Sequence, residues 1–197
     1  MDSICHCAMN FIKLKNYEYK FVVSRNFKEQ IIMLNFKDVD FFHLAGLHYL
    51  KDISIPRNRE KTINSVIHKK TITDSLIMKS KIYQNPTPDL NIKARIEELS
   101  VLEEYLDDDN LIRIYQNNKN HGSAIDADYF IESKAKGNIV YIFIKKRDDN
   151  SGYYRVNSIF RKGSYVYNGT NLYWMLKEKI GLGREKILFK HKDYKIP

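Results

Sequence analysis

The sequence predicts an α+β fold, with an N-terminal hairpin and a helical block packed on a C-terminal antiparallel β-sheet. Between residues 58 and 110, apolar side chains recur at the three- and four-residue spacing of amphipathic helices. After Leu111 they alternate at the two-residue spacing of strands. The 197 residues are 43% hydrophobic, with 14 Tyr and 10 Phe, which is enough apolar material for a core. We therefore expect a single domain over 1–197 with three parts: 17–57, 58–110 and 111–197.

The N-terminal part reads as a hairpin, and a helical block follows it. Tyr17 to Ser24 and Gln30 to Phe36 are strand-like runs on either side of a short polar turn. Asn58 suits a helix start, and further helices are expected near Asp74 to Ile82 and after the cap Asn91. The apolar side of the helix after Asn91 consists of Ile92, Ile96, Leu99, Leu102 and Leu106.

Two histidines follow the hairpin in a stretch that reads as one helix. The acidic residues Asp38 and Asp40 suit its start, and Pro56 ends the element. Five residues of continuous helix place His43 and His48 about 140° apart around the axis. The sequence therefore predicts that these two histidines do not share one site.

The C-terminal part is expected to be a sheet with a closing helix. Strands are predicted at Leu111 to Gln116, Asp128 to Ser133, Asn138 to Lys146, Tyr153 to Arg161, Ser164 to Tyr167 and Ile187 to Phe189. The stretch from Thr170 to Ile180 reads as a short helix that ends at Gly181.

Positive charge is concentrated in this C-terminal part. Residues 133–197 carry 15 Lys and Arg against 5 Asp and Glu, whereas residues 1–132 carry 18 against 19. A localised basic excess is typical of a nucleic-acid surface, because each phosphate contact releases counterions. The sequence therefore predicts a polyanionic partner, with RNA as the first choice. The residues expected to bind it are Arg155, Arg161, Lys162, Tyr165 and Tyr167.

Several other classes of site find no support in the sequence. It contains no phosphate-binding glycine loop, nucleophile elbow or paired-histidine zinc helix. The run Cys5-His6-Cys7 has the wrong spacing for zinc, and Asp107 to Asp109 read as a solvated helix end, so neither a metal nor a cofactor is expected. Two cysteines and the lack of a long apolar run predict a cytoplasmic protein without a membrane span.

Histidine, lysine, arginine and tyrosine remain, and these residue types can cleave RNA without a metal. The ribose 2′-hydroxyl is an internal nucleophile, so the protein needs to supply a base, a proton donor and cations for the phosphorane. Histidine suits the proton transfers because its unperturbed pKa is about 6.5. Lysine, arginine and tyrosine supply charge, hydrogen bonds and base stacking.

Two stretches resemble a known family. Asp40 to Leu47, DFFHLAGL, is similar to the F-x-H-L-[TA]-G-L signature of a nuclease domain predicted in phages and mobile elements, within the barnase/EndoU/colicin/RelE-like superfamily. Tyr141 to Lys145 and Tyr154 to Phe160, followed by the segments at 165–167 and 176–179, resemble the hairpin and the closing strand and helix of that family. The similarity spans roughly residues 20 to 180. It implies metal-independent RNA cleavage.

The resemblance implies His43 as the acid or base, and it emphasises Ser158; Lys145, at the end of a buried strand, completes the expected catalytic set. Strand alternation places Arg155 and Arg161 on one exposed face and Ser158 on the core face, so a hydrogen-bonded core serine stays open as a reading.

Two alternatives to an RNA-cleaving toxin or phage–host conflict effector stay open as well. One is a non-catalytic nucleic-acid binder, and the other is an interaction module for an acidic inhibitor or antitoxin protein. The oligomeric state, the cognate partner, the RNA sequence that is cut and the role of the block 58–110 are not readable from the sequence.

Overall fold

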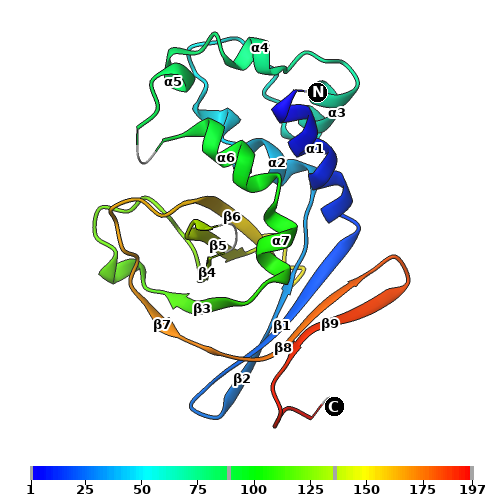
Figure 1. Ribbon diagram of the computed structural model, residues 1–197, viewed down its shortest axis with the longest axis vertical. Coiled ribbons are helices and arrows are strands. Elements are labelled where there is room, and N and C mark those ends of the chain that lie inside the picture. The colour runs from blue at the N-terminus through cyan, green and yellow to red at the C-terminus, as the bar shows by residue number, and fades with distance from the viewer. Residues whose placement is uncertain (1, 88–89, 135–136, 196–197) are drawn as a thin grey trace.

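A strongly curved mixed sheet forms the frame of the molecule, and most of the helices gather at one end of it (Figure 1). The computed structural model describes residues 2–87, 90–134 and 137–195. Within these residues the sheet has nine strands in the order β7-β3-β4-β5-β6-β2-β1-β8-β9. The strands are β1 Tyr17–Arg25, β2 Lys28–Leu34, β3 Asn110–Tyr115, β4 Tyr129–Ser133, β5 Val140–Lys146, β6 Tyr154–Arg161, β7 Gly169–Asn171, β8 Tyr173–Gly181 and β9 Arg184–Lys190.

The sheet closes on itself into a barrel-like shape. Only Leu172 separates β7 from β8, although β7 pairs with β3 at one end of the strand order and β8 pairs with β1 near the other. The described strand pairs are antiparallel, apart from β2 and β6, which run parallel and meet at Leu34 and Tyr154. The predicted α+β class is confirmed, with the hairpin β1–β2 built into the sheet instead of packing on it.

The prediction of a closing helix from Thr170 to Ile180 is wrong, because this stretch forms β7 and β8. The three charged side chains of its Lys-Glu-Lys run are buried in the sheet and have partners. Lys177 donates to the Asp108 carbonyl at 2.7 Å, Glu178 pairs with Lys20 at 2.9 Å, and Lys179 pairs with Asp107 at 3.0 Å. Pairing with β1 therefore overrides the local helix preference.

The helices differ from the prediction in number as well as at their ends: the first was not predicted, and the helices expected near Asp74 to Ile82 and after Asn91 are each divided in two. They are α1 Ser3–Leu14, α2 Asp38–Leu44, α3 Thr62–Ile67, α4 Asp74–Ile77, α5 Lys81–Gln84, α6 Ile92–Leu99 and α7 Leu102–Asp107, with 3₁₀ turns η1 Leu47–Tyr49, η2 Arg59–Lys61 and η3 Asn117–Lys119. Asn91 caps α6 as expected and accepts from the Ala94 amide at 2.9 Å. In the part of the chain that is described, none of the helices is long and apolar enough to cross a bilayer.

Helix α1 carries the Cys5-His6-Cys7 run. Its apolar face buries Ile4, Cys7 and Phe11 in the main core, and this burial raises the pKa of the Cys7 thiol to about 12. Among the described residues, no group of three or more His, Cys, Asp or Glu is arranged to hold a metal ion.

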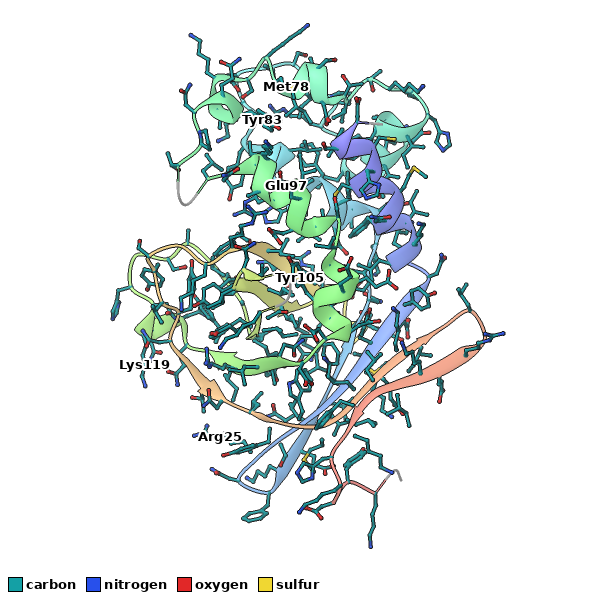
Figure 2. The ribbon with its side chains drawn as sticks, viewed as in Figure 1. Arg25, Met78, Tyr83, Glu97, Tyr105 and Lys119 are labelled. Atoms are coloured by element: carbon teal, nitrogen blue, oxygen red, sulfur yellow. The ribbon has the colours of Figure 1, made fainter. Side chains whose placement is uncertain are left out.

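The two larger buried clusters lie on opposite faces of the sheet, and a small third one contains Val22, Leu176 and Tyr194. The larger core lies between the sheet and the helices, and it includes Ile142, Ile144, Val156 and Ile159. The smaller core is aromatic and lies on the other face of the β3–β6 strands; it contains Tyr115, Phe130, Tyr141 and Phe143, with Phe160 and Tyr167 packed against it. Figure 2 labels Glu97 on α6, where the helices meet the sheet, and Met78 and Tyr83 at the end of the molecule far from the sheet.

Two loops cover the smaller core and become one wall of the site. The predicted strand from Ser164 to Tyr167 is wrong, because these residues lie in the loop 162–168 between β6 and β7. Asn120, from the loop 116–128, joins the two loops: its side chain accepts from the Asn168 amide at 2.7 Å and donates to the Asn168 carbonyl at 2.9 Å.

Candidate functional site

A cleft of about 490 Å³ opens where α2, η1 and α6 meet the end of β6 and the two loops. The side chains that line it include His43, Tyr49, Arg95, Asp126, Asn157, Ser158, Phe160, Arg161, Tyr165 and Tyr167. The cleft thus brings together two predicted catalytic residues, His43 and Ser158, and three predicted binding residues, Arg161, Tyr165 and Tyr167. Lys145, Arg155 and Lys162 lie outside its lining.

Helix α2 holds His43 in place through a buried ion pair. The Asp40 carboxylate accepts from Arg147 at 2.6 and 3.2 Å, and the side chains of both residues are 4% exposed. Arg147 also donates to the Asn35 side chain at 2.6 Å, while Asp40 caps its own helix by accepting from the Lys37 amide at 2.9 Å. The start of α2 is therefore fixed to the segment that follows β5, and His43 lies one turn further on.

His43 and His48 lie side by side, so the predicted separation of about 140° is wrong, although His48 lines neither cleft. Their rings stack with centroids 4.2 Å apart and planes 17° from parallel. Helix α2 ends at Leu44, and Gly46 then takes a left-handed conformation, φ +74°, that folds η1 back against the helix. The signal was present in the sequence, because a glycine just after a helical run favours a helix end.

The surroundings lower the pKa of both imidazoles and so favour their neutral forms. Burial lowers the pKa of His43, with help from the charges of Arg95, Arg59 and Arg155, and a hydrogen bond to the Asn157 backbone acts in the opposite direction. Burial and the neighbouring His43 lower the pKa of His48 to about 4. Because the bond to Asn157 uses one ring N–H of neutral His43, its other ring nitrogen is left to accept a proton.

Arg95 is a buried cation that pairs with no carboxylate among the described residues, and the sequence patterns did not single it out. The residue is 5% exposed, and burial lowers the pKa of its guanidinium. Its partners there are uncharged: Nη1 donates to Ser158 Oγ at 3.2 Å, and the guanidinium lies 5.4 Å from the ring centroids of Tyr49 and Phe160. A desolvated charge costs several kcal/mol, so the cleft has a strong preference for an anion at this point.

The sequence held a signal for Arg95 as well. The residue follows Ile92 by three positions and precedes Leu99 by four, so it lies on the apolar side of the amphipathic helix. A cation at a core-facing position needs a partner, and within the described residues the side chain of Arg95 makes its hydrogen bond to Ser158.

A β-bulge in β6 decides which way its side chains point. Ile144 pairs with Val156 and Phe143 pairs with Ser158, so Asn157 is an extra residue in the strand. Val156 and Ile159 therefore face the larger core, whereas Ser158 and Phe160 face the aromatic side. The prediction that Arg155 and Arg161 share one face is wrong, because the bulge between them reverses the alternation.

The remaining predicted residues are partly occupied by other contacts. Arg161 pairs with Glu98 and, at 2.9 Å, with Glu97. Lys145 pairs with Asp126, which raises the pKa of this lysine. Tyr165 donates to the His121 carbonyl at 3.3 Å, and its ring centroid lies 4.7 Å from that of Tyr167. Lys162 is exposed beside the cleft.

A second, smaller cleft lies on the other side of His43. It has a volume of about 210 Å³ and is lined by Val39, Asp40, His43, Arg59, Arg155, Val156 and Asn157. His43 and Asn157 line both clefts, so the imidazole stands between them.

One comparison with known proteins assigns the chain to a family. The family model PBECR4, described as phage-Barnase-EndoU-ColicinE5/D-RelE like nuclease4, matches residues 3–193. No curated protein and no solved structure matches the chain. The matched range includes every residue of both clefts and confirms the resemblance seen in the segment Asp40 to Leu47. The chain therefore belongs to this phage nuclease family, whose substrates are nucleic acids.

Proposed function

We propose that this protein is an endoribonuclease that cuts RNA by attack of the ribose 2′-hydroxyl, without a metal ion. The observation that carries the proposal is the meeting of a neutral histidine, His43, and an uncompensated buried cation, Arg95, in one cleft. A neutral imidazole suits a general base, and a desolvated guanidinium suits the charge of a phosphorane. The basic surface of the C-terminal part supports the choice of a nucleic acid.

The proposed reaction is a transesterification. The free ring nitrogen of His43 takes the proton from the 2′-hydroxyl while the 2′-oxygen bonds to phosphorus. Arg95 binds the non-bridging oxygens, the bond from phosphorus to the 5′-oxygen breaks, and a tyrosine hydroxyl, for which Tyr165 is the candidate, gives that oxygen its proton. One proton is removed and one is delivered, and the products are a 2′,3′-cyclic phosphate and a 5′-hydroxyl.

Ser158 and Lys145 act in this proposal through other residues. Ser158 holds Arg95 by the 3.2 Å hydrogen bond to its guanidinium. Lys145 fixes Asp126, which lines the cleft and whose backbone carbonyl accepts from Asn157 at 2.9 Å. Ser158 and Lys145 are therefore positioning residues. Tyr165 and Tyr167 offer aromatic surfaces on which a base can stack.

The test is incubation of the purified chain with total RNA, with and without EDTA, followed by mapping of the new ends. We expect cyclic phosphate ends in both conditions and loss of cleavage in His43→Ala, with circular dichroism unchanged. His68→Ala is the matched control, because His68 is exposed at the end of α3 and lies in neither cleft.

RNA that stays intact with folded protein, while salt-dependent binding persists, selects the non-catalytic binder instead. The cationic cleft also suits an acidic inhibitor protein, whose binding we expect to compete with RNA.

A further inference from the structure

The second cleft carries positive charge that nothing in it neutralises. Arg59 and Arg155 both line it, and its carboxylate, Asp40, is already bound by Arg147. The nearest recorded carboxylate for Arg155 is that of Asp148, 3.9 Å away on a side chain that is 81% exposed. Exposed pairs at such a distance contribute little, so this contact leaves the guanidinium available.

Arg155 also has an unmet hydrogen-bond donor. Its Nε is buried, and within the described chain it has no partner. A buried donor without a partner is unfavourable, so a ligand that accepts from it is favoured. Arg59, on η2, is exposed, and no hydrogen bond or ion pair among the described residues occupies its guanidinium.

The lining of this cleft favours a phosphate over a base. The first cleft has aromatic side chains, Tyr49, Phe160, Tyr165 and Tyr167, on which a base can stack. The described lining of the second cleft holds no Phe, Tyr or Trp, and its apolar residues are Val39 and Val156. Two arginines in a cleft with so little aromatic surface are suited to the sugar-phosphate backbone.

The position of the cleft identifies which phosphate this is. Both clefts share His43 and Asn157, while Arg155 lines only the second cleft and Ser158 only the first. An RNA strand that places one phosphate beside Arg95 and runs past His43 therefore places its next phosphate in the second cleft.

We propose that Arg155 and Arg59 form a phosphate subsite for the nucleotide adjacent to the scissile bond, so that the preferred substrate is an RNA strand with at least two consecutive phosphates. The inference rests on the proposed RNA cleavage at His43. It adds the requirement for a second phosphate, which cleavage alone does not make.

The first experiment compares three short substrates, UpU, UpUp and pUpU. We expect the wild-type protein to cut one of the two phosphorylated dinucleotides at least tenfold more efficiently, in kcat/KM, than UpU, and this identifies the side on which the subsite lies. Arg155→Met is expected to remove that advantage, so that the variant cuts the three substrates with similar kcat/KM. Lys186→Met, at an exposed lysine of β9 away from both clefts, is the matched control.

A rival role for Arg155 is that its charge only keeps His43 neutral. In that case Arg155→Met shifts the pH profile of kcat/KM to higher pH. It also changes the kcat/KM of all three substrates by the same factor, and this result overturns the subsite. Equal kcat/KM values for the three substrates in the wild type overturn it as well.

A binding measurement separates this inference from the proposed chemistry. The probe is a fluorescent 2′-O-methyl pentanucleotide, which cannot undergo attack by the 2′-oxygen. Arg155→Met and Arg59→Gln are each expected to weaken its binding and to reduce the slope of log K against log salt by about 0.7, the value for one phosphate on a single strand. The subsite is overturned if affinity and slope are unchanged in both variants. It is also overturned if the wild-type protein binds the probe no more tightly than a variant that carries both substitutions. Either result counts even if RNA cleavage is found.

Discussion

The imidazole of His43 lies flat against that of His48, with ring centroids 4.2 Å apart, and the ring of Tyr49 continues the stack at 3.8 Å from His48. Stacked imidazoles of this kind resist protonation, because a charge on either ring is poorly solvated. The pKa of both histidines is lowered, that of His48 to about 4.

The protein is therefore expected to lose stability as the pH falls from about 6.5 towards 4. A histidine whose folded pKa lies below its unfolded value of about 6.5 binds fewer protons in the folded state, so acid favours unfolding over that window. The measurement is the urea midpoint at pH 7.5 and at pH 5.0. In His48→Phe, which keeps an aromatic ring in the stack, the drop is expected to be smaller; an equal drop assigns the pH dependence to other groups.

Arg95→Met is expected to separate activity from stability. The substitution removes a buried charge without a counter-ion and retains most of the apolar side chain, so the free energy of unfolding stays the same or rises. Cleavage is expected to fall about a hundredfold or more, as for the loss of a donor to a developing charge. Thermal unfolding and kcat/KM on one RNA check both parts. Lys93→Met, at an exposed lysine of the same helix, is expected to change neither.

Asp40→Asn is expected to lower the free energy of unfolding by about 3–5 kcal/mol, because it leaves Arg147 buried with an incomplete partner. The exposed pair of Lys37 and Asp149, 2.6 Å apart, supplies the comparison, and Asp149→Asn is expected to have a much smaller effect. Chemical denaturation of both variants measures the difference. Equal losses contradict the role of the Asp40 pair as the anchor of α2.

Gly46→Ala is expected to reduce both stability and cleavage. Its φ of +74° is unfavourable for alanine, and an added Cβ lies 3.1 Å from Cδ of Arg95. Gly152→Ala is the control, because Gly152 has a similar φ of +78° and nothing within 4 Å of the added atom. Both variants share the backbone strain, so a loss of activity in Gly46→Ala alone isolates the contact with Arg95. Similar activity in the two variants argues against that contact.

Sequence patterns predicted the fold class, most strands and the cap at Asn91, because these follow from local periodicity. They did not predict β8, since the burial of Lys177 and Lys179 depends on partners from α7 and the segment after it. The motif pointed to His43 within the cleft. Arg95 was missed because it was hidden in an amphipathic pattern, and the opposite directions of Arg155 and Arg161 depend on a bulge that alternation does not reveal.

The pairing of β2 with β6 has a consequence for folding. Leu34 and Tyr154 make the strand pair recorded at this junction, supported by the Asn35 amide, which donates to the Tyr154 carbonyl at 3.1 Å. His43 follows β2, whereas Asn157 and Ser158 belong to β6, more than a hundred residues later in the chain. Contacts between such distant segments form late, because the loop entropy must be overcome first. A newly synthesised chain is therefore expected to stay inactive until the whole barrel has assembled, which makes cleavage a sensitive reporter of complete folding.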